Sequence, residues 1–392
     1  MFSIVLSSAR CVAIGACLLV AAQSTATIYT VTPVTVDSTL SKLISGDTVA
    51  LVGTFGEVRL TNRTFTRAIT IDASRAVFTT TMVLDNVQGV AVIGGIFNIG
   101  PNGSYAKGIA VYGGKNIYLD GMTVNGGADG LVDQFGVTLS GTYNGQVTNA
   151  KLNGLYSGIS LGGVTGGWIA KNKSMGSTSD GIDIGDSHGI KVIANTCASG
   201  HPGPGAHPDC IQVWSVAGHA LASDITITRN SASGPTQGFT DFDQGLRLNI
   251  SNNTVATSYP AGVACYDCVN SKITGNVLTT LSGAAYQTQV IVLGGSGNTV
   301  SGNTVAAYNA PPTSGPVLAD AMSGFVDAAP PFALDAIARP ADMGAAASPF
   351  REALLVDAPA AVPEPSTWAL LIAGFAAVGV ARRRSRTLGT AV

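Results

Sequence analysis

Charged residues are scarce in this sequence: Asp, Glu, Lys and Arg make up only 11% of its 392 residues. So few Lys, Glu and Arg argue against a mainly helical protein, because these residues are good helix formers. The formal net charge is only −2, which gives no electrostatic basis for binding nucleic acid, so no such partner is expected. The chain has only four His and six Cys, without the tight H-x-x-x-H or C-x-x-C…H spacing of a zinc site.

Glycine is abundant instead, and asparagine recurs at regular steps. The 49 Gly, together with Val, Ile, Thr and Asn, are typical of short strands joined by tight bends. Six Asn residues each stand three residues after a Val or Ile, at intervals of 23 to 35 residues: Asn172, Asn195, Asn230, Asn253, Asn276 and Asn303. Such a step is about one turn of a chain wound into three short strands, and stacking would let each Asn amide bond the next.

A second repeat marks the start of each coil: a Gly or Cys followed by an apolar residue, at steps of 22 to 29 residues from position 108 to 262. Apolar and polar residues alternate after each start, which predicts one outer row of polar side chains: Thr138, Ser160, Asp183, Gln212 and Thr240. A propeller needs about 40–50 residues per blade, and a sandwich lacks this stacking of like residues. The sequence therefore predicts an all-β fold, a right-handed parallel β-helix (solenoid), over residues 27–305.

Both ends of the chain look like targeting segments. Residues 1–26 combine Arg10, an apolar run at 11–22 and small residues at 24–26, which is the layout of a signal peptide. We expect export through the Sec translocon and cleavage after Ala26, with an uncleaved anchor as the alternative. Residues 306–361 are rich in Ala and Pro without a regular period, which predicts a disordered spacer.

Residues 362–386 combine Pro-Glu-Pro at 363–365, an apolar stretch at 367–381 and three Arg at 382–384. We expect the apolar stretch to form a short C-terminal transmembrane helix with the Arg cluster on its cytoplasmic side, followed by a tail at 387–392. The three parts closely resemble the PEP-CTERM sorting signal of Gram-negative bacteria. The resemblance implies cleavage by an exosortase and then release or surface attachment, so that only this tail contacts a membrane. A plain C-terminal anchor is the alternative.

The interval between Asn195 and Asn230 exceeds the usual step by 12 residues, which predicts inserted loops at 199–208 and 215–223. All four His residues fall in this coil or just before it: His188, His201, His207 and His219. Loops on a rigid scaffold are frequent places for functional residues. A long loop with solvated His side chains is the alternative.

Three carboxylates cluster in the same coils. Asp180 and Asp209 each directly precede a coil start, so they are expected to stack about 5 Å apart, with Asp183 nearby. Carboxylates that close raise one pKa or recruit a cation, which provides an acid–base pair or a Ca²⁺ site at Asp180, Asp183 and Asp209. No other cofactor is expected. A turn role for Asp before Gly is the alternative.

These residues resemble a known group of enzymes. Residues 178–183 (TSDGID) are similar to the N-T-D-G-x-D motif of polygalacturonase-type glycoside hydrolases, and residues 209–211 to the second half of their D-D-C motif. The resemblance implies inverting hydrolysis of pectic chains, with Asp180 and Asp209 activating water. The sequence departs from that family at Pro208, which replaces the proton donor, and at Gln237, where its G-H-G motif would stand. Its R-x-K motif is missing around residues 263–266.

Residues 207–212 (HPDCIQ) resemble instead the H-P-D-x-I-Q of bacterial right-handed β-helix proteins of pectate-lyase-like fold. A lyase needs a base for the sugar C5 proton and a cation for the acid group. His207 or His201 is the candidate base, and Arg247 or Lys191 the candidate cation. The residues expected to bind substrate are Gln212, Trp214, His201 and Gln237. Trp214, Tyr266 and Phe242 are candidates for stacking on sugars, with edge packing as the alternative.

The cysteines fit an exported protein. A disulfide between Cys197 and Cys210 is expected to clamp the His-bearing loop. Cys265 aligns with inward Val213 and is a core candidate, while residues 265–268 have the C-x-x-C spacing of redox sites without the following helix.

Two functions remain open from the sequence. The first is an enzyme of acidic extracellular polysaccharides, a lyase or a glycoside hydrolase. The second is a non-catalytic matrix or adhesive protein displayed among exopolysaccharide. In both, the partners expected are a polysaccharide and the export machinery, and the protein is expected to be a monomer.

Overall fold

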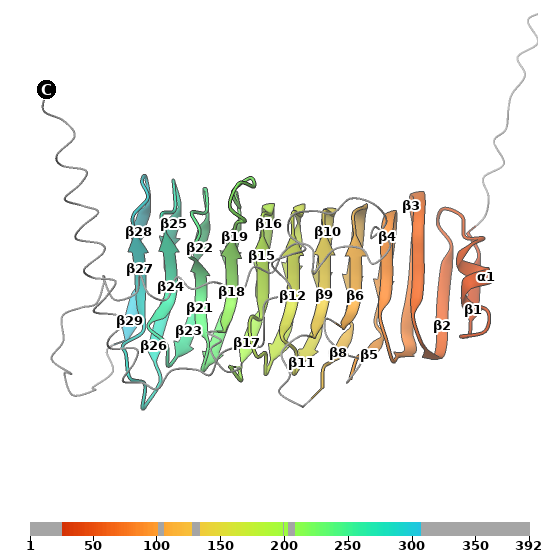
Figure 1. Ribbon diagram of the computed structural model, residues 1–392, viewed down its shortest axis with the longest axis horizontal. Helices are drawn as coiled ribbons and strands as arrows, with labels where there is room; N and C mark the ends of the chain where they lie inside the picture. Colours follow the sequence, from red (N-terminus) through yellow and green to blue (C-terminus); the bar gives the residue numbers. More distant parts are fainter. Residues whose placement is uncertain (1–25, 101–105, 128–133, 199, 203–207, 307–392) are drawn as a thin grey trace, which may run out of the picture.

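The computed structural model describes residues 26–100, 106–127, 134–198, 200–202 and 208–306. The chain winds as a long stack of coils, with β1 (Ile28–Val31) and α1 (Val36–Leu40) at one end and the blue strands at the other (Figure 1). Neighbouring coils pair through parallel strands, for example β12 with β15 and β15 with β18. The predicted all-β, right-handed parallel β-helix is confirmed. The signal peptide, the spacer, the sorting tail and its predicted transmembrane helix lie outside the described residues.

Each regular coil contributes one strand to each of three sheets. Sheet 1 contains β6 (Lys107–Tyr112), β9 (Phe135–Ser140), β12 (Ser157–Gly162), β15 (Ile182–Gly185), β18 (Asp209–Trp214), β21 (Gln237–Asp241), β24 (Ala261–Tyr266) and β27 (Gln289–Leu293). Sheet 2 contains β7 (Lys115–Asp120), β10 (Tyr143–Thr148), β13 (Thr165–Ala170), β16 (His188–Ile193), β19 (Thr226–Thr228), β22 (Asn249–Ser251), β25 (Lys272–Thr274) and β28 (Thr299–Ser301). Sheet 3 contains β5 (Ile96–Asn98), β8 (Thr123–Asn125), β11 (Lys151–Asn153), β14 (Lys173–Met175), β17 (Thr196–Ala198), β20 (Ser231–Gly234), β23 (Thr254–Thr257), β26 (Val277–Thr280) and β29 (Thr304–Ala306).

The first coils are built differently, from longer strands that run on through the bends: β2 (Thr48–Phe55), β3 (Val58–Phe78) and β4 (Met82–Ile93). Their interior holds a stack of three aromatic rings, with centroids 5.6 Å apart between Phe55 and Phe78 and 4.3 Å apart between Phe78 and Phe97. Helix α1 adds the buried side chains of Val36 and Leu40 at this end. Stacked like residues therefore fill the interior from the first coils onward.

The asparagine ladder runs through the bend between sheet 2 and sheet 3. From Asn172 to Asn303, each side-chain amide nitrogen donates to the side-chain oxygen of the next Asn, at 2.9, 3.0, 3.1, 2.9 and 2.9 Å. The same nitrogen donates its other hydrogen to a backbone carbonyl, as Asn195 does to Ile169 at 2.8 Å. The residue before each ladder Asn is left-handed, with φ between 55° and 66°. The ladder inferred from the spacing is confirmed.

Shorter amide ladders, which do not follow the spacing of the main ladder, support the earlier coils. Asn125 donates to Asn98, and Asn153 donates to Asn125, each at 2.9 Å. These side chains lie on the exposed ends of strands in sheet 3. They lack the preceding Val or Ile at the same offset, so the pattern used for the main ladder did not find them.

The polar row of sheet 1 has the predicted register but not an open surface. Thr138 pairs with Ser160, Ser160 with Asp183, Asp183 with Gln212 and Gln212 with Thr240. Their neighbours in the strands, such as Ile159 and Leu161, belong to the core, so the row lies on the other side of the sheet. Yet the exposed fractions of the five side chains are only 0 to 8%. Alternation sets the side on which a residue lies, but it does not set how much solvent reaches it.

Replacing a buried ladder residue should lower stability far more than replacing an exposed one. Asn230→Ala removes the bonds to Asn195 and Asn253 and leaves buried polar partners, so we expect a loss of about 2–3 kcal/mol in the free energy of unfolding. Asn153→Ala, at the exposed end of β11, is the matched control and should stay within about 0.5 kcal/mol of the parent. Equal losses in urea unfolding of the two variants would contradict this role of the ladder.

Candidate functional site

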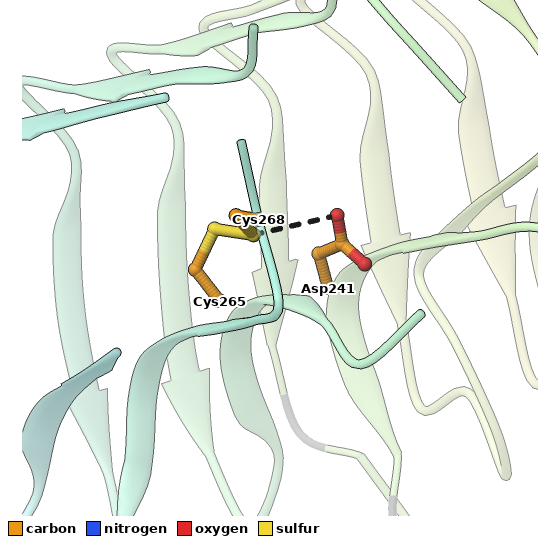
Figure 2. Close-up of side chains that lie close together, drawn as sticks. All are labelled: Asp241, Cys265 and Cys268. Atoms are coloured by element: carbon orange, nitrogen blue, oxygen red, sulfur yellow. Dashed lines mark hydrogen bonds between the residues drawn. A yellow bond between two sulfur atoms is a disulfide. The ribbon is translucent and has the colours of Figure 1, made fainter. Parts of the chain in front are cut away.

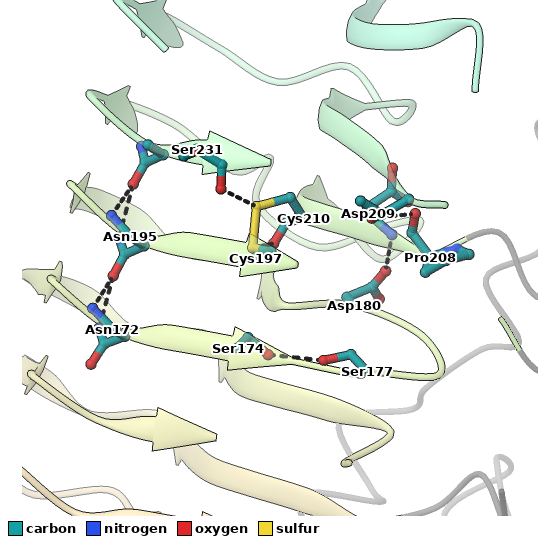
Figure 3. The surroundings of a disulfide bond; sticks show 12 residues. Asn172, Ser174, Ser177, Asp180, Asn195, Cys197, Pro208, Asp209, Cys210 and Ser231 are labelled. Atoms are coloured by element: carbon teal, nitrogen blue, oxygen red, sulfur yellow. Dashed lines mark hydrogen bonds between the residues drawn. A yellow bond between two sulfur atoms is a disulfide. The ribbon is translucent and has the colours of Figure 1, made fainter. Parts of the chain in front are cut away.

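Asp180 and Asp209 lie in successive coils at the edge of sheet 1 (Figure 3). The Asp209 backbone N–H donates to Oδ1 of Asp180 at 2.9 Å, and the Gly181 N–H donates to the Asp209 carbonyl at 2.8 Å. Each carboxylate also accepts a hydroxyl: Ser179 donates to Oδ2 of Asp180 at 3.2 Å, and Thr240 donates to Oδ1 of Asp209 at 3.0 Å. The two acids are therefore brought together, although only 7% and 1% of their surfaces are exposed.

The local sequence makes this close approach feasible. A Cβ on Gly181 would lie 2.5 Å from Sγ of Cys197 and 2.7 Å from the Cys210 carbonyl, so only glycine fits between the acids and the next coil. Cys197 and Cys210 form a disulfide with their Cα atoms 5.4 Å apart, which is the pairing expected from the sequence (Figure 3). The disulfide ties β17 to β18 across the loop. By limiting the entropy of the unfolded chain, it stabilises the folded protein by about 3 kcal/mol.

The carboxyl of Asp183 is strongly perturbed by its surroundings. It lies in β15, in register with Gln212 of β18, and its Oδ1 accepts the indole N–H of Trp214. The ring of Trp214 covers Gly185, where a Cβ would lie 2.5 Å from the indole. The pKa of Asp183 is raised to about 7, chiefly by burial; the Trp214 hydrogen bond opposes this rise and the negative charge of Asp209 adds to it. Asp183 therefore keeps its proton under mildly acidic conditions.

The expected substrate-binding residues divide between this site and other places. Gln237 pairs in register with Asp209, and Gln212 pairs in register with Asp183. We call the resulting group of side chains the acidic array of sheet 1: Asp180, Asp183, Asp209, Gln212, Trp214 and Gln237. His201 is exposed in the bend, where its N–H donates to the Ser177 carbonyl at 2.9 Å. His207 lies outside the described residues.

The other histidines hold the 215–223 loop to the scaffold. Nδ1 of His219 lies 2.6 Å from Oδ2 of Asp186, whose Oδ1 accepts the Val216 N–H at 2.8 Å. Nδ1 of His188 lies 3.0 Å from the Ser223 hydroxyl. The clustering of His in one coil thus reflects, in these two cases, attachment of a loop.

The candidate cations, Arg247 and Lys191, make their contacts away from this array. Phe242 and Tyr266 pack against each other. Arg247 is exposed and its guanidinium pairs with Asp224, with Nη2 to Oδ2 at 2.6 Å, and Lys191 lies on β16 in sheet 2. Phe242 and Tyr266 pack edge to face, with ring centroids 4.9 Å apart, and only 5% of Tyr266 is exposed. Edge packing, not sugar stacking, describes this pair.

The residues expected to hold Ca²⁺ do not fit that ion. Among the described parts of the chain, Asp180, Asp183 and Asp209 do not bring three carboxylate oxygens within 4.8 Å of one another. One carboxylate oxygen of Asp180 accepts a backbone N–H, and one of Asp183 accepts an indole N–H. No step is therefore assigned to Ca²⁺ here.

A second acidic group, missed from the sequence, lies inside the coil (Figure 2). Asp241 follows Thr240 at the end of β21 and pairs in register with inward Val213 and Cys265. Cys265 and Cys268 form a disulfide, and Sγ of Cys268 lies 3.7 Å from Oδ2 of Asp241. Asp241 accepts the Asp243 N–H at 2.8 Å, and burial raises its pKa to about 7. Its contacts identify it as a turn-stabilising carboxyl beside a buried disulfide.

Comparisons with known proteins agree with this architecture. Residues 361–385 match the model of the PEP-CTERM protein-sorting motif, and residues 60–205 match that of the periplasmic copper-binding protein NosD, a right-handed β-helix family. The chain carries a PEP-CTERM sorting motif on a right-handed parallel β-helix. The motif indicates export and surface sorting in a Gram-negative bacterium. Within the described segments, no helix has the length and apolar character needed to cross a bilayer.

Solved structures similar to this chain include an alginate lyase, an exopolygalacturonase and an adhesin. An alginate lyase from Paenibacillus sp. str. FPU-7 is 16% identical, with 71% of this chain and 99% of that one covered and a TM-score of 0.45. A family 28 exopolygalacturonase from Yersinia enterocolitica is 11% identical, with 73% and 79% covered and a TM-score of 0.46.

PfbA, a surface adhesin of Streptococcus pneumoniae, is 10% identical, with 69% of this chain and 86% of that one covered and a TM-score of 0.40. Likeness at these levels concerns the fold alone. Curated protein sequences give no significant match.

The buried carboxyl of Asp241 should make stability depend on pH. The folded protein keeps this proton up to about pH 7, whereas the unfolded chain releases it near the ordinary value of 3.8. Asp241 therefore favours folding at low pH, and this contribution is lost as the pH rises between those values. We expect Asp241→Asn, which keeps an acceptor for the Asp243 N–H, to gain stability relative to the parent as the pH rises from 4 to 8.

The measurement is urea unfolding of both proteins across that range under non-reducing conditions. Asp224→Asn is the control, because Asp224 is exposed and the Arg247 hydrogen bond lowers its pKa, so the sign of its effect is opposite. A stability difference between parent and Asp241→Asn that does not vary with pH would show that Asp241 is ionised in the folded protein.

Proposed function

We propose that this protein is a surface-sorted glycoside hydrolase of an extracellular acidic polysaccharide, with Asp183 and Asp209 as its acid and base. The observation that carries the proposal is the pair of unlike carboxyls: Asp183 with a pKa of about 7, beside Asp209, whose negative charge contributes to that shift. Two neighbouring carboxyls whose environments differ in this way are the usual basis of acid–base division of labour.

The roles follow from the contacts. Oδ1 of Asp183 is held by the Trp214 indole, so Oδ2 carries the proton that passes to the glycosidic oxygen as that bond breaks. Asp209 takes a proton from the water whose oxygen attacks the anomeric carbon. Asp180 is a positioning residue, because its carboxylate accepts the Asp209 backbone N–H. Gln212 and Gln237, in register with Asp183 and Asp209, are the neighbours that bind sugar hydroxyls.

The proposed path to the substrate begins with the signal peptide and the Sec translocon. Exosortase then cleaves at the Pro-Glu-Pro, after the apolar stretch at 367–381 has held the chain briefly in the inner membrane. The spacer at 306–361 separates that tail from the β-helix domain at 27–305, which acts as a monomer. The PEP-CTERM match supports this order of events.

A second candidate function is a non-catalytic matrix or adhesive protein. One observation favours it: the exposed fractions of Asp180, Asp183 and Asp209 are 7, 8 and 1%, which is little for groups that must reach a polymer. In that case the array is a structural polar network whose members satisfy one another.

The test is an assay of acidic polysaccharides, such as alginate and polygalacturonate, for new reducing ends and for absorbance at 232 nm. The proposal predicts reducing ends without the absorbance, because hydrolysis, unlike elimination, forms no unsaturated product. Asp183→Asn should lower the rate at least about 100-fold, since general acid catalysis contributes that much. The parent rate should fall as the pH rises through about 7, where Asp183 loses its proton.

Asp224→Asn is the matched control, an exposed acid paired with Arg247 away from the array, and it should keep the parent rate. A full rate in Asp183→Asn would place the chemistry elsewhere. Release of 232 nm absorbance would assign a lyase, and no product from any polymer would favour the non-catalytic function.

A further inference from the structure

Sheet 2 presents a surface that differs in character from the acidic array of sheet 1. Two aromatic side chains stand out of β10 and β13, with exposed fractions of 54% for Tyr143 and 50% for Trp168. Each ring has a lysine beside it: Nζ of Lys115 lies 5.3 Å from the Tyr143 ring centroid, and Nζ of Lys191 lies 5.8 Å from that of Trp168. We call Lys115, Tyr143, Gln146, Trp168 and Lys191 the Trp168 strip.

The coil register builds this strip. Lys115 pairs with Tyr143, Gln146 with Trp168 and Trp168 with Lys191, so each ammonium lies one coil from its ring. Adjacent strands are about 4.8 Å apart, and the strip therefore crosses four successive coils in steps of that size. Because a rigid sheet holds the two rings, little side-chain freedom is lost when a ligand covers them.

The positive charges of Lys115 and Lys191 are not neutralised by carboxylates in the described part of the chain. Both ammonium groups are exposed, on a protein whose formal net charge is −2. Two unpaired cations next to two open rings are complementary to a ligand that carries both acid groups and flat C–H faces.

We propose that the Trp168 strip is a docking site for an acidic polysaccharide, separate from the acidic array of sheet 1. Pyranose rings stack on Tyr143 and Trp168, Lys115 and Lys191 bind uronate carboxylates, and Gln146, in register with Trp168, binds a sugar hydroxyl. The strip takes its ligand class from the proposed function, but binding here requires no catalysis. It holds the same kind of chain for a hydrolase or for a matrix protein.

The geometry favours a glycan over other polyanions. A lipid bilayer requires a continuous apolar area, whereas each ring of the strip has a lysine beside it and Trp168 also pairs with Gln146. Nucleic-acid surfaces combine many Lys and Arg residues over a longer groove, and this strip has two lysines. Both alternatives are included as outcomes of the test.

The test is isothermal titration of the mature protein with alginate and polygalacturonate octamers, with dextran as the neutral probe. We expect Trp168→Ala to weaken binding of an acidic octamer at least tenfold, and dextran to bind poorly. Replacing both lysines, Lys115→Gln with Lys191→Gln, should weaken binding and remove most of its dependence on salt. The same tenfold loss on Trp168→Ala is expected in an Asp183→Asn background, which separates failure of the strip from failure of the catalytic proposal.

Two controls match the strip in residue type and exposure: Tyr286→Ala, whose side chain is 55% exposed, and Lys173→Gln, which is exposed on β14 in sheet 3. Both should bind like the parent. The proposal is overturned if Trp168→Ala binds normally, if the parent binds no acidic octamer, or if dextran binds equally well. Preferential binding to phosphatidylglycerol vesicles or to single-stranded DNA would overturn it as well.

Discussion

The hydrogen bond from one Asn side-chain amide to the next is the interaction on which the rest of this molecule depends. It repeats five times between Asn172 and Asn303, always in the same bend, and the first four of these bonds are buried. A slip of one residue would break every such bond and turn every core side chain outward. The ladder therefore fixes the coil register, and the register decides which acids, rings and lysines become neighbours.

Much of this arrangement could be read from the sequence, because stacking requires like residues at like intervals. The Asn period predicted the coils, and the position of Asp180 and Asp209 before the coil starts predicted that they stack. Alternation puts Asp241 inward, in register with Val213 and Cys265, but it does not predict that the core accommodates a carboxyl at this strand end. It also failed for the exposure of Asp183, since burial there depends on how the Trp214 ring folds back across Gly185. The pairing of Lys191 with Trp168 required the register itself.

The two sheets divide binding and chemistry between them in the proposed account. The acidic array of sheet 1 is enclosed, and burial there raises the pKa of Asp183 to about 7. The Trp168 strip of sheet 2 is open to solvent, so its lysines keep their charge available to a ligand. A long polymer can bind along the open strip while only a short stretch of the same polymer contacts Asp183 and Asp209. The solenoid permits this separation because each coil extends both surfaces at once.

The most direct test of the register is a distance between two distant coils. Lys151, Lys173, Thr196, Ser231, Thr254 and Val277 form one vertical row in sheet 3, so the first and last are five strand spacings apart. Nitroxide labels on Lys151→Cys and Val277→Cys, both exposed positions, should give a narrow pulsed-EPR distance distribution centred at roughly 24 Å. A broad distribution, or one centred well beyond that distance, would contradict the stacked coils and the neighbourhoods that they create.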